Sequence, residues 1–316
     1  MPHDLLSLLG EISNANIENS VISPVQLRIA QDMDIKISML RLDKVHPVIS
    51  GNKLFKLSYY LQETLLTPHK TIITFGGAYS NHLAATAYAC KLLNIKCIGL
   101  VRGEKPAILS DTLVFCRKNE MELEFLSREE YRKIASKPEH AFLKEKYGDH
   151  CLIPEGGYST KGMLGASLIC DYYTSNQYTH ICLPVGTATT LAGIIKNTNT
   201  STNIIGFPAL KGMMDISERL HFLKIENFSN LSLVHDYHFG GFGKKTPKLV
   251  YFMNQFYREQ QIPLDVVYTA KMMFGVQDMV QKKYFPAGSD ILCIHTGGLQ
   301  GHRSIKEMLE YGSPLV

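Results

Sequence analysis

Four short apolar runs, each followed by a small turn, constrain the fold of this chain more than any other feature. They cover residues 71–75, 180–184, 264–268 and 291–295. The first run precedes helical spacing at 81–93 and a further apolar run at 96–101; helical spacing also follows through 191–195 and from about Thr269. Continuous apolar runs that alternate with helices are typical of parallel strands covered on both faces. The sequence therefore predicts an α/β fold.

The composition narrows the class of protein. The chain has 316 residues, is 45% hydrophobic and carries a net charge of only +4, which allows one large or two medium domains. This balance argues against nucleic-acid binding and disorder, and no apolar stretch is long enough for a membrane span. The seven scattered cysteines form no Cys-x-x-Cys, and residues 1–14 do not resemble a signal peptide. We expect reduced thiols and a cytoplasmic location.

The turns after the apolar runs are the expected ligand site, because parallel sheets bind ligands beyond the carboxyl ends of their strands. One turn combines a glycine, three hydroxyls and a helix start, which suits a phosphate group. Its residues are Gly186, Thr187, Ala188, Thr189 and Thr190. A tight turn with a threonine N-cap explains the same residues equally well.

Lys53 is the first candidate for chemistry. It follows Gly51 and Asn52 and opens a predicted helix with an apolar stripe at Leu54, Leu57, Leu61 and Leu65. Taken alone, it reads as a solvated surface lysine. A buried lysine with a lowered pKa is, however, what a Schiff base with an aldehyde cofactor requires.

The turn before the helix at 81–93 carries further candidates. Ser80 or Asn81 caps that helix, or the helix start binds a substrate carboxylate. His82 alone is more often a structural histidine. His235 and His238 have one-turn helical spacing, but no further metal ligands accompany them, so we predict no metal site.

Motifs of rival enzyme classes are absent from the sequence. No Gly-x-Gly-x-x-Gly follows a strand, and no Gly-x-Ser-x-Gly surrounds Ser80 or Ser159. The stretch at 240–244 lacks the upstream glycine and the final Ser/Thr of a P-loop. A dinucleotide oxidoreductase, an α/β-hydrolase and a P-loop protein are thereby disfavoured.

The order of the motifs is more specific than any one of them. It runs Asn52-Lys53, Gly76-Gly77-Ala78-Tyr79-Ser80-Asn81, Pro154-Glu155-Gly156-Gly157, the turn at 186–190, Val267-Tyr268-Thr269-Ala270-Lys271 and His295-Thr296-Gly297-Gly298. Over residues 40–301 this order resembles the 1-aminocyclopropane-1-carboxylate deaminase and D-cysteine desulfhydrase family of pyridoxal-phosphate enzymes, which have the tryptophan-synthase β fold.

The resemblance implies a role for each site residue. Lys53 would form the Schiff base with pyridoxal 5′-phosphate, Asn81 would contact its ring hydroxyl, and the residues of the 186–190 turn would hold its phosphate. Ser80, Asn81 and His82 would lie near the substrate carboxylate. Tyr268 would face the substrate, and Thr269 would meet the pyridine nitrogen.

The resemblance also implies an architecture. Two open, mainly parallel twisted sheets with helices on both faces would enclose the cofactor between two domains. The small domain would cover 56–164, where residues 103–150 are rich in charge, and the large one 1–55 and 165–316. A homodimer is expected because the family is dimeric.

Three positions bear on the substrate. The deaminases of the family have a glutamate after the catalytic tyrosine, whereas this chain has Thr269, as the desulfhydrases do. A neutral partner suits β-elimination, in which a good leaving group lessens the need for a stabilised carbanion. Phe242 replaces a tyrosine of relatives, and Gly157-Tyr158-Ser159 replaces their Gly-Ser-Asn, so altered specificity is one interpretation.

The sequence thus favours a lyase that converts a small amino acid, D-cysteine foremost, to pyruvate, ammonia and sulfide. The base would be Lys53, Ser80 or Tyr268. Cyclopropane ring opening is the alternative reaction. A cofactor-binding protein without turnover and a metabolite-binding protein without the cofactor are the non-catalytic alternatives.

Overall fold

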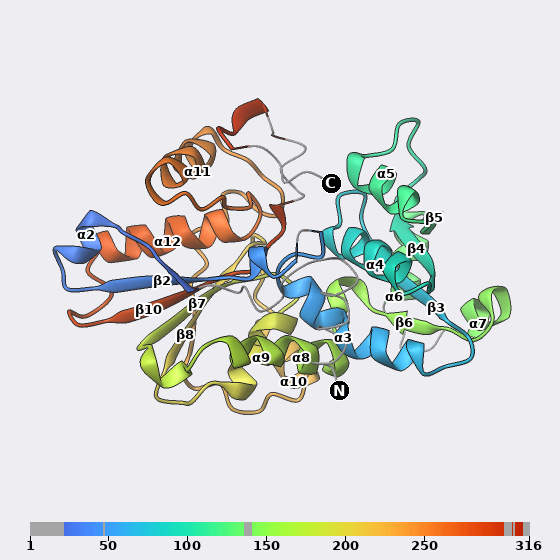
Figure 1. Cartoon of the computed structure of the whole chain (residues 1–316), viewed down its shortest axis with the longest axis horizontal. Helices are drawn as coiled ribbons and strands as arrows, with labels where there is room; N and C mark the ends of the chain where they lie inside the picture. Colours follow the sequence, from blue (N-terminus) through green and yellow to red (C-terminus); the bar gives the residue numbers. More distant parts are fainter. Residues whose placement is uncertain (1–21, 47, 136–140, 300–304, 306, 312–316) are drawn as a thin grey trace.

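The structure is a computed structural model that describes residues 22–46, 48–135, 141–299, 305 and 307–311. The expectations for the N-terminal segment, up to residue 21, and for Pro47 lie outside these residues. The described chain forms two mainly parallel sheets with helices against them (Figure 1). The predicted α/β fold with two such sheets is therefore confirmed.

The first sheet has six strands and occupies one side of the molecule (Figure 1). Its order is β1 (Ile22–Pro24), β2 (Lys36–Arg41), β10 (Asp290–His295), β7 (His180–Val185), β8 (Asn203–Pro208) and β9 (Leu231–Leu233). Only β1 pairs antiparallel, with β2. Strand β10 pairs with β2 on one side and β7 on the other, so its carboxyl end lies in the middle of the sheet.

The second sheet has four strands, all parallel. Its order is β5 (Glu122–Leu126), β4 (Lys96–Arg102), β3 (Thr71–Gly76) and β6 (Cys151–Ile153). Cys97, Ile98, Leu100 and Val101 of β4 are all buried, as a strand covered on both faces requires.

Helices cover both faces of the first sheet: α11 and α12 lie on one side, and α8, α9 and α10 lie on the other (Figure 1). The helices are α2 (Arg28–Gln31), α3 (Asn52–Leu65), α4 (Asn81–Leu92), α5 (Asp111–Lys118), α6 (Arg128–Ala135), α7 (Ala141–Tyr147), α8 (Thr160–Ser167), α9 (Thr189–Asn197), α10 (Ile216–Phe222), α11 (Pro247–Gln260) and α12 (Thr269–Gln281). Short 3-10 turns occur at η2 (Leu42–Lys44), η3 (Glu155–Gly157), η4 (Leu168–Tyr172) and η5 (Ser175–Gln177).

Most elements predicted from the sequence are confirmed. Strands β3, β4, β7 and β10 and helices α4, α9 and α12 lie within one or two residues of the predicted bounds. In α3, Leu54, Leu57 and Leu61 are fully buried, so the apolar stripe faces the core. The seven cysteines are free thiols.

The predicted strand at 264–268 is wrong. Although Leu264 and Val266 are buried, the segment pairs with no strand, and side chains satisfy its backbone. The Tyr311 hydroxyl lies 3.3 Å from Leu264 N and 2.9 Å from Leu264 O. The Asp265 carboxylate accepts three consecutive N–H groups, from Val267, Tyr268 and Thr269. These hydrogen bonds turn the chain into α12. The apolar run is therefore explained by burial and not by strand pairing.

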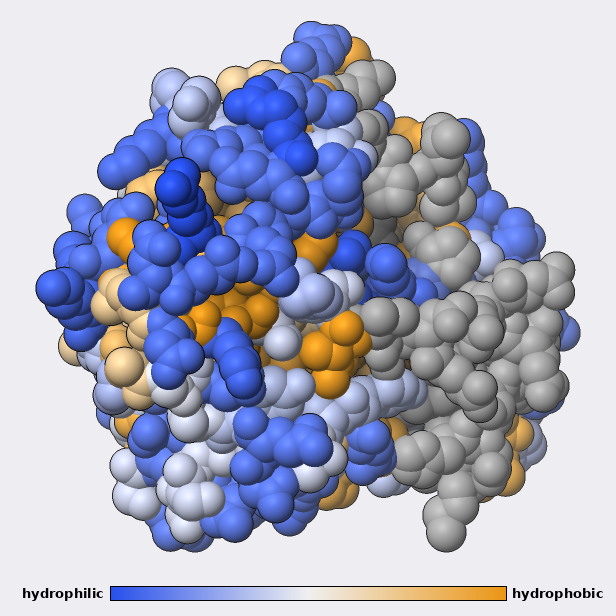
Figure 2. Space-filling view, turned by 60° about the vertical axis from the view of Figure 1, so that its left-hand side comes forward, coloured by the Kyte–Doolittle hydropathy of each residue, from blue (hydrophilic) through white to orange (hydrophobic). Residues whose placement is uncertain are grey.

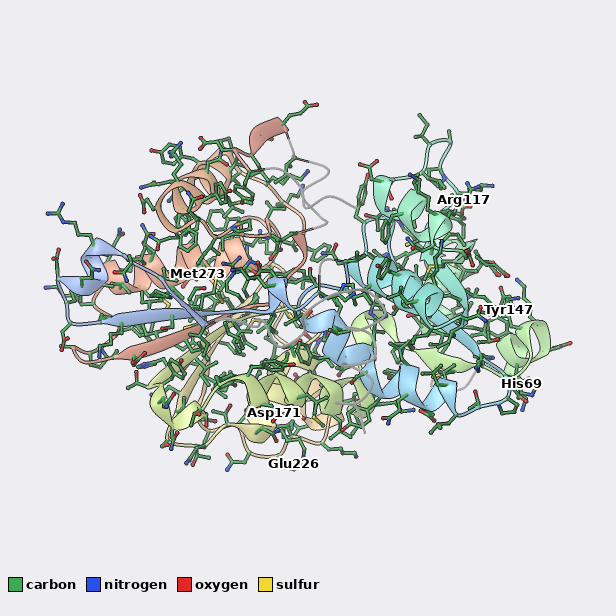
Figure 3. The ribbon with its side chains drawn as sticks, in the orientation of Figure 1. His69, Arg117, Tyr147, Asp171, Glu226 and Met273 are labelled. Atoms are coloured by element: carbon green, nitrogen blue, oxygen red, sulfur yellow. The ribbon has the colours of Figure 1, made fainter. Side chains whose placement is uncertain are left out.

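The described residues of the charge-rich region 103–150 form the outer side of the second sheet. Figure 3 places Arg117 and Tyr147 on that side, whereas Met273 lies in α12 beside the first sheet. On the face drawn in Figure 2, hydrophilic residues predominate and hydrophobic ones form small separate groups. The division of the chain into domains at 56–164 stays a prediction.

A search of the described residues finds no helix whose length and hydropathy would let it cross a membrane.

The hydrogen bonds of Asp265 predict a large loss of stability on substitution. Asp265→Ala removes a buried acceptor of three N–H groups, and we expect the free energy of unfolding to fall by about 2–3 kcal/mol. Urea unfolding measures this change. Asp32→Ala at an exposed position should change it by less than about 0.5 kcal/mol. An Asp265→Ala loss as small as that of the control would contradict our account of the turn.

Candidate active site

A cleft of about 1040 Å³ lies where carboxyl ends of strands from both sheets come together. Its lining includes the turns after β3 and β7, the end of β4, the start of α3 and the segment before α12. All the residues predicted for catalysis and binding line this cleft except Thr269, which directly follows Tyr268. Segments as far apart in the sequence as Asn52 and Thr296 therefore meet at one site, as the topology of parallel sheets requires.

Close backbone packing places Lys53 in this cleft. Gly51 has φ 75°, and a Cβ there would lie 2.0 Å from the carbonyl oxygen of Thr296, just beyond β10. Only glycine fits such an approach. Asn52 N donates to the same carbonyl at 3.2 Å, so α3 begins directly against the end of β10.

Asn52 links Lys53 to the turn that follows β7. Lys53 Nζ donates to Asn52 Oδ1 at 2.7 Å, and Asn52 Nδ2 donates to Thr190 Oγ1 at 2.8 Å. Asn52 is buried. Sequence analysis did not assign it a role, although its position beside the lysine was a signal.

The environment of Lys53 disfavours its charged form. Burial lowers the pKa of its ammonium from the ordinary value to about 8, and the charge of Asp265 opposes this shift only in part. Near neutral pH a much larger fraction of the side chain is an uncharged amine than in an exposed lysine. The reading of Lys53 as a solvated surface residue is therefore wrong.

The turn at 186–190 leaves the start of α9 without a side-chain cap. The N-cap is Ala188, in the left-handed conformation with φ 66°, and no side chain accepts a hydrogen bond there. Thr187 and Thr189 pair their hydroxyl oxygens with each other at 2.8 Å. The threonine N-cap considered from the sequence is wrong. A helix start with hydroxyls and no cap suits an anion.

Lys56 is a second buried cation of the cleft, and sequence analysis did not single it out. Its Nζ donates to Gly156 O at 3.0 Å, and burial, with the charge of Lys53, holds its pKa well below the ordinary value. A Cβ on Gly156 would lie 2.9 Å from Thr187 Cγ2, so this ammonium sits beside the turn after β7. Its place three residues after Lys53, on the same helix face, was the available signal.

Ser80 and Asn81 lie at the start of α4. Ser80 Oγ accepts from Leu83 N at 3.2 Å, so the capping role predicted for it is confirmed. Asn81 Nδ2 donates weakly to Gly298 O at 3.4 Å across the cleft. Both side chains are partly exposed to the cleft, where a ligand can reach them.

His82 is tied to the second sheet. The Thr74 hydroxyl donates to Ile153 O at 2.9 Å, so His82 Nε2, 2.9 Å from that hydroxyl, must be the donor to it. Its Nδ1 is then a buried acceptor without a partner. Burial, together with the charges of Lys56 and Lys53, lowers the pKa of His82 to about 3. These contacts favour the structural interpretation of this histidine.

Tyr268 and Thr269 follow the bend made by Asp265. Tyr268 lies against the turn after β7, since a Cβ on Gly186 would be 3.1 Å from its ring, and Lys53 Nζ lies 5.9 Å from its ring centre. Burial and the charges of Asp265 and Glu155 raise the pKa of its hydroxyl. Thr269 is fully buried, and its Oγ1 has no hydrogen-bond partner in the part of the chain that the structure describes.

The positions that departed from the family pattern are also placed. Phe242 lines the cleft, with its ring centre 6.0 Å from that of Tyr268. Tyr158 stacks on Phe222 at 5.0 Å, and Ser159 caps α8 through Gly162 N.

His235 and His238 lie in a turn rather than on a helix, so the helical spacing seen in the sequence is wrong. Among the described residues no group of three or more His, Cys, Asp or Glu side chains is placed to hold a metal ion.

Comparison with known proteins bears on this geometry. The sequence model described as "Pyridoxal-phosphate dependent enzyme" matches residues 24–297. A Thermotoga maritima protein with the provisional name 1-aminocyclopropane-1-carboxylate deaminase is 30% identical, over 88% of this chain and 94% of that protein. A mitochondrial bifunctional D-cysteine desulfhydrase/1-aminocyclopropane-1-carboxylate deaminase of Arabidopsis thaliana is 27% identical, over 80% of this chain and 70% of that protein. The crystal structure of a homologue of 1-aminocyclopropane-1-carboxylate deaminase shares the fold, with a TM-score of 0.75 over 96% of this chain and 99% of that chain, at 24% identity.

The lowered pKa of Lys53 predicts how a substitution affects the ligand-free protein. In the unfolded chain the lysine titrates near 10.4. At pH 7 the lysine is mostly charged in both states, and burial makes that charge unfavourable in the folded state. Above about pH 10 the lysine becomes neutral in both states, and this cost is lost. We expect Lys53→Met to stabilise the protein by about 1–2 kcal/mol at pH 7, and by less as the pH rises from 8 to 10.

Urea unfolding at pH 7, 8.5 and 10 measures this gain. Lys70→Met, at an exposed position, serves as the control and should show no such trend. A gain for Lys53→Met that is constant over this range would contradict the assignment.

Proposed function

The chain belongs to the pyridoxal-phosphate dependent enzyme family, and from this premise we propose that it is a lyase that eliminates sulfide from D-cysteine or a related small amino acid. The products would be pyruvate, ammonia and sulfide. The observation that carries the proposal is the buried hydroxyl of Thr269, which has no partner beside the cleft.

Three features in or directly beside the cleft fit pyridoxal phosphate. The amine of Lys53 has a lowered pKa, as bond formation with an aldehyde requires. The uncapped start of α9 and the ammonium of Lys56 lie together and suit the phosphate. The unpartnered hydroxyl of Thr269 suits the pyridine nitrogen. The proposed attachment residue is therefore Lys53, with Asn81 toward the ring hydroxyl.

Bound pyridoxal phosphate supplies an aldehyde for the substrate amine and a ring that withdraws electrons from Cα. The reaction itself needs one proton removed from Cα and the bond from Cβ to sulfur broken, with the electron pair leaving on sulfur. The released enamine takes up one water and gives pyruvate and ammonia. The protein must therefore bind the substrate, remove one proton from Cα and hold the reacting groups in place.

Among the three candidate bases, the contacts favour Lys53. Its pKa of about 8 lets the amine accept a proton near neutral pH. The pKa of Tyr268 is raised, so its hydroxyl keeps its proton and suits the role of donor to the leaving sulfur. Ser80 Oγ already accepts from Leu83 N as a helix cap.

The choice of substrate rests on Thr269. A hydroxyl cannot keep a pyridine nitrogen charged as a carboxylate does, so the ring withdraws electrons less strongly. Elimination of a good leaving group tolerates this, whereas opening of a cyclopropane ring is harder. The start of α4, with Ser80 and Asn81, is the proposed place for the substrate carboxylate.

Ring opening of 1-aminocyclopropane-1-carboxylate is the second candidate. The name of the T. maritima relative and one of the two activities in the name of the A. thaliana relative favour it. A cytoplasmic homodimer is proposed on the family likeness alone, and light scattering after gel filtration tests the dimer.

An amino-acid panel tests the proposal. The purified protein is incubated with D-cysteine, L-cysteine, D-serine and 1-aminocyclopropane-1-carboxylate, and ammonia, sulfide and keto acid are measured. We expect pyruvate and sulfide from D-cysteine, and at least about a 100-fold loss of rate in Lys53→Ala but not in Lys70→Ala.

The other outcomes separate the alternatives. 2-Oxobutyrate from the cyclopropane substrate would support the second candidate. An absorbing lysine–cofactor band without turnover would indicate a binding protein, and a colourless protein that gains no such band would exclude the cofactor. Activity that survives in Lys53→Ala would rule out the mechanism.

Thr269→Val tests the partner of the pyridine nitrogen separately. Because the hydroxyl has no partner among the described residues, its removal should stabilise the cofactor-free chain by up to about 1 kcal/mol, as measured by urea unfolding. Affinity for pyridoxal phosphate, followed by absorbance titration, should fall about 5–10-fold.

The matched control is Thr74→Val, whose hydroxyl donates to Ile153 O. It should lower the free energy of unfolding by about 1–2 kcal/mol. If Thr269→Val destabilised the free chain and left cofactor affinity intact, Thr269 would be a structural residue only.

A further inference from the structure

A glycine-rich loop at residues 240–243 forms part of the cleft wall, and Phe242 is its only side chain. Gly240, Gly241 and Gly243 all have positive φ, at 88°, 116° and 67°, so the loop follows a path that other residues rarely adopt. The ring of Phe242 meets that of Tyr268 edge to face, at an interplanar angle of 68°. It remains 56% exposed, toward the cleft and the solvent.

A buried lysine of α12 holds this loop. Lys271 is only 2% exposed, and its Nζ donates to Gly241 O at 2.8 Å. It also lies 3.5 Å from Ala209 O, where the segment that carries Leu210 and Met213 begins. No ion pair with Lys271 occurs in the described part of the chain, and the proposed chemistry does not use this residue. A buried cation without a counter-ion lowers stability, which indicates that Lys271 has a role other than stabilising the fold.

The surroundings of Lys271 allow it to bind both carbonyls in its charged form. Burial lowers the pKa of its ammonium to about 8, and the charge of Asp265 opposes this shift. At neutral pH much of the side chain is therefore protonated and can donate to Gly241 and Ala209 together.

We propose that Lys271 is a positioning residue that fixes the 240–243 loop so that Phe242 forms an apolar wall over Tyr268, where the substrate's Cβ substituent lies. Leu210 and Met213 line the same cleft and extend this wall. The site therefore favours an amino acid with an apolar group on the atom that leaves Cβ, such as an S-alkyl or S-benzyl cysteine. This choice of substrate rests on the proposed function, whereas the positioning by Lys271 does not.

The positioning can be measured without any substrate. The chain contains no tryptophan, so Phe242→Trp introduces a single fluorescent probe into the loop. In the full-length protein, with and without pyridoxal phosphate, we expect acrylamide to quench this probe much less than in urea. Adding Lys271→Met should raise quenching at least about twofold, because the loop then opens more often.

Two controls isolate the hydrogen bond to Gly241. Lys244→Met removes an exposed charge from the neighbouring loop residue and should leave quenching unchanged. Lys271→Gln keeps a donor and should restore part of the protection. Equal quenching with Lys271 and Lys271→Met would overturn the positioning role. If Lys271→Met does not fold, the single Phe242→Trp variant decides, since a probe quenched as strongly as in urea would show that the ring is not held.

The substrate preference has its own measurement. With S-benzyl-D-cysteine and D-cysteine, elimination breaks the same bond from Cβ to sulfur, and the sulfur leaves with its electron pair. We expect Phe242→Ser to lower the ratio of kcat/KM for the benzyl substrate over D-cysteine about tenfold, mainly through KM. An unchanged ratio would overturn the apolar wall. Absence of turnover with every amino acid would instead overturn the proposed function, while the quenching result would still stand.

Discussion

The contact between Gly51 and Thr296 determines the rest of the site. It joins the first turn of α3 to the carboxyl end of β10, the strand in the middle of the six-stranded sheet. Because α3 also packs along α8 and toward the second sheet, its first residues lie where both sheets end. A side chain larger than hydrogen at position 51 would separate these backbones. Lys53, the proposed attachment residue, is thus positioned by a contact that involves no side chain on either partner.

Buried charge is the second feature that runs through the structure. Lys53, Lys56 and Lys271 all have lowered pKa values because the protein shields them from water. Asp265, which is 1% exposed, is the acid whose charge acts on both Lys53 and Lys271, while its oxygens accept the N–H groups that begin α12. The buried cations in and beside the cleft outnumber the buried anions. This excess of positive charge is unfavourable in the protein alone and favours a ligand that carries a phosphate.

Predictions from the sequence were correct for elements whose structure depends on one local pattern of residues. Continuous apolar runs identified β3, β7 and β10, and the serine before Asn81 identified the start of α4. The prediction was wrong for a segment whose structure depends on hydrogen bonds that no local pattern shows. The run at 264–268 is apolar because it is buried, but its backbone bonds to Tyr311 and to its own Asp265, which no periodicity reveals.

Some residues of the candidate site could be predicted from the sequence, and others could not. Lys53, Tyr268 and the turn after β7 were predicted from the order of the motifs, which can be read from a single sequence. Lys56 and Asn52 were not found, because their importance comes from partners 100 and 138 residues away. Their places beside Lys53 and three residues after it were the signals in the sequence, and neither signal names these distant partners.

The hydrogen bonds of Asn52 have a consequence for how the cleft receives a ligand. They tie the amine of Lys53 to Thr190. In the proposed site, these bonds set the spacing between the lysine and the turn after β7 before a ligand binds, so a molecule of matching length gives up little conformational entropy in joining them. The two ends are then interdependent, and a substitution at Asn52 would weaken binding at both of them together.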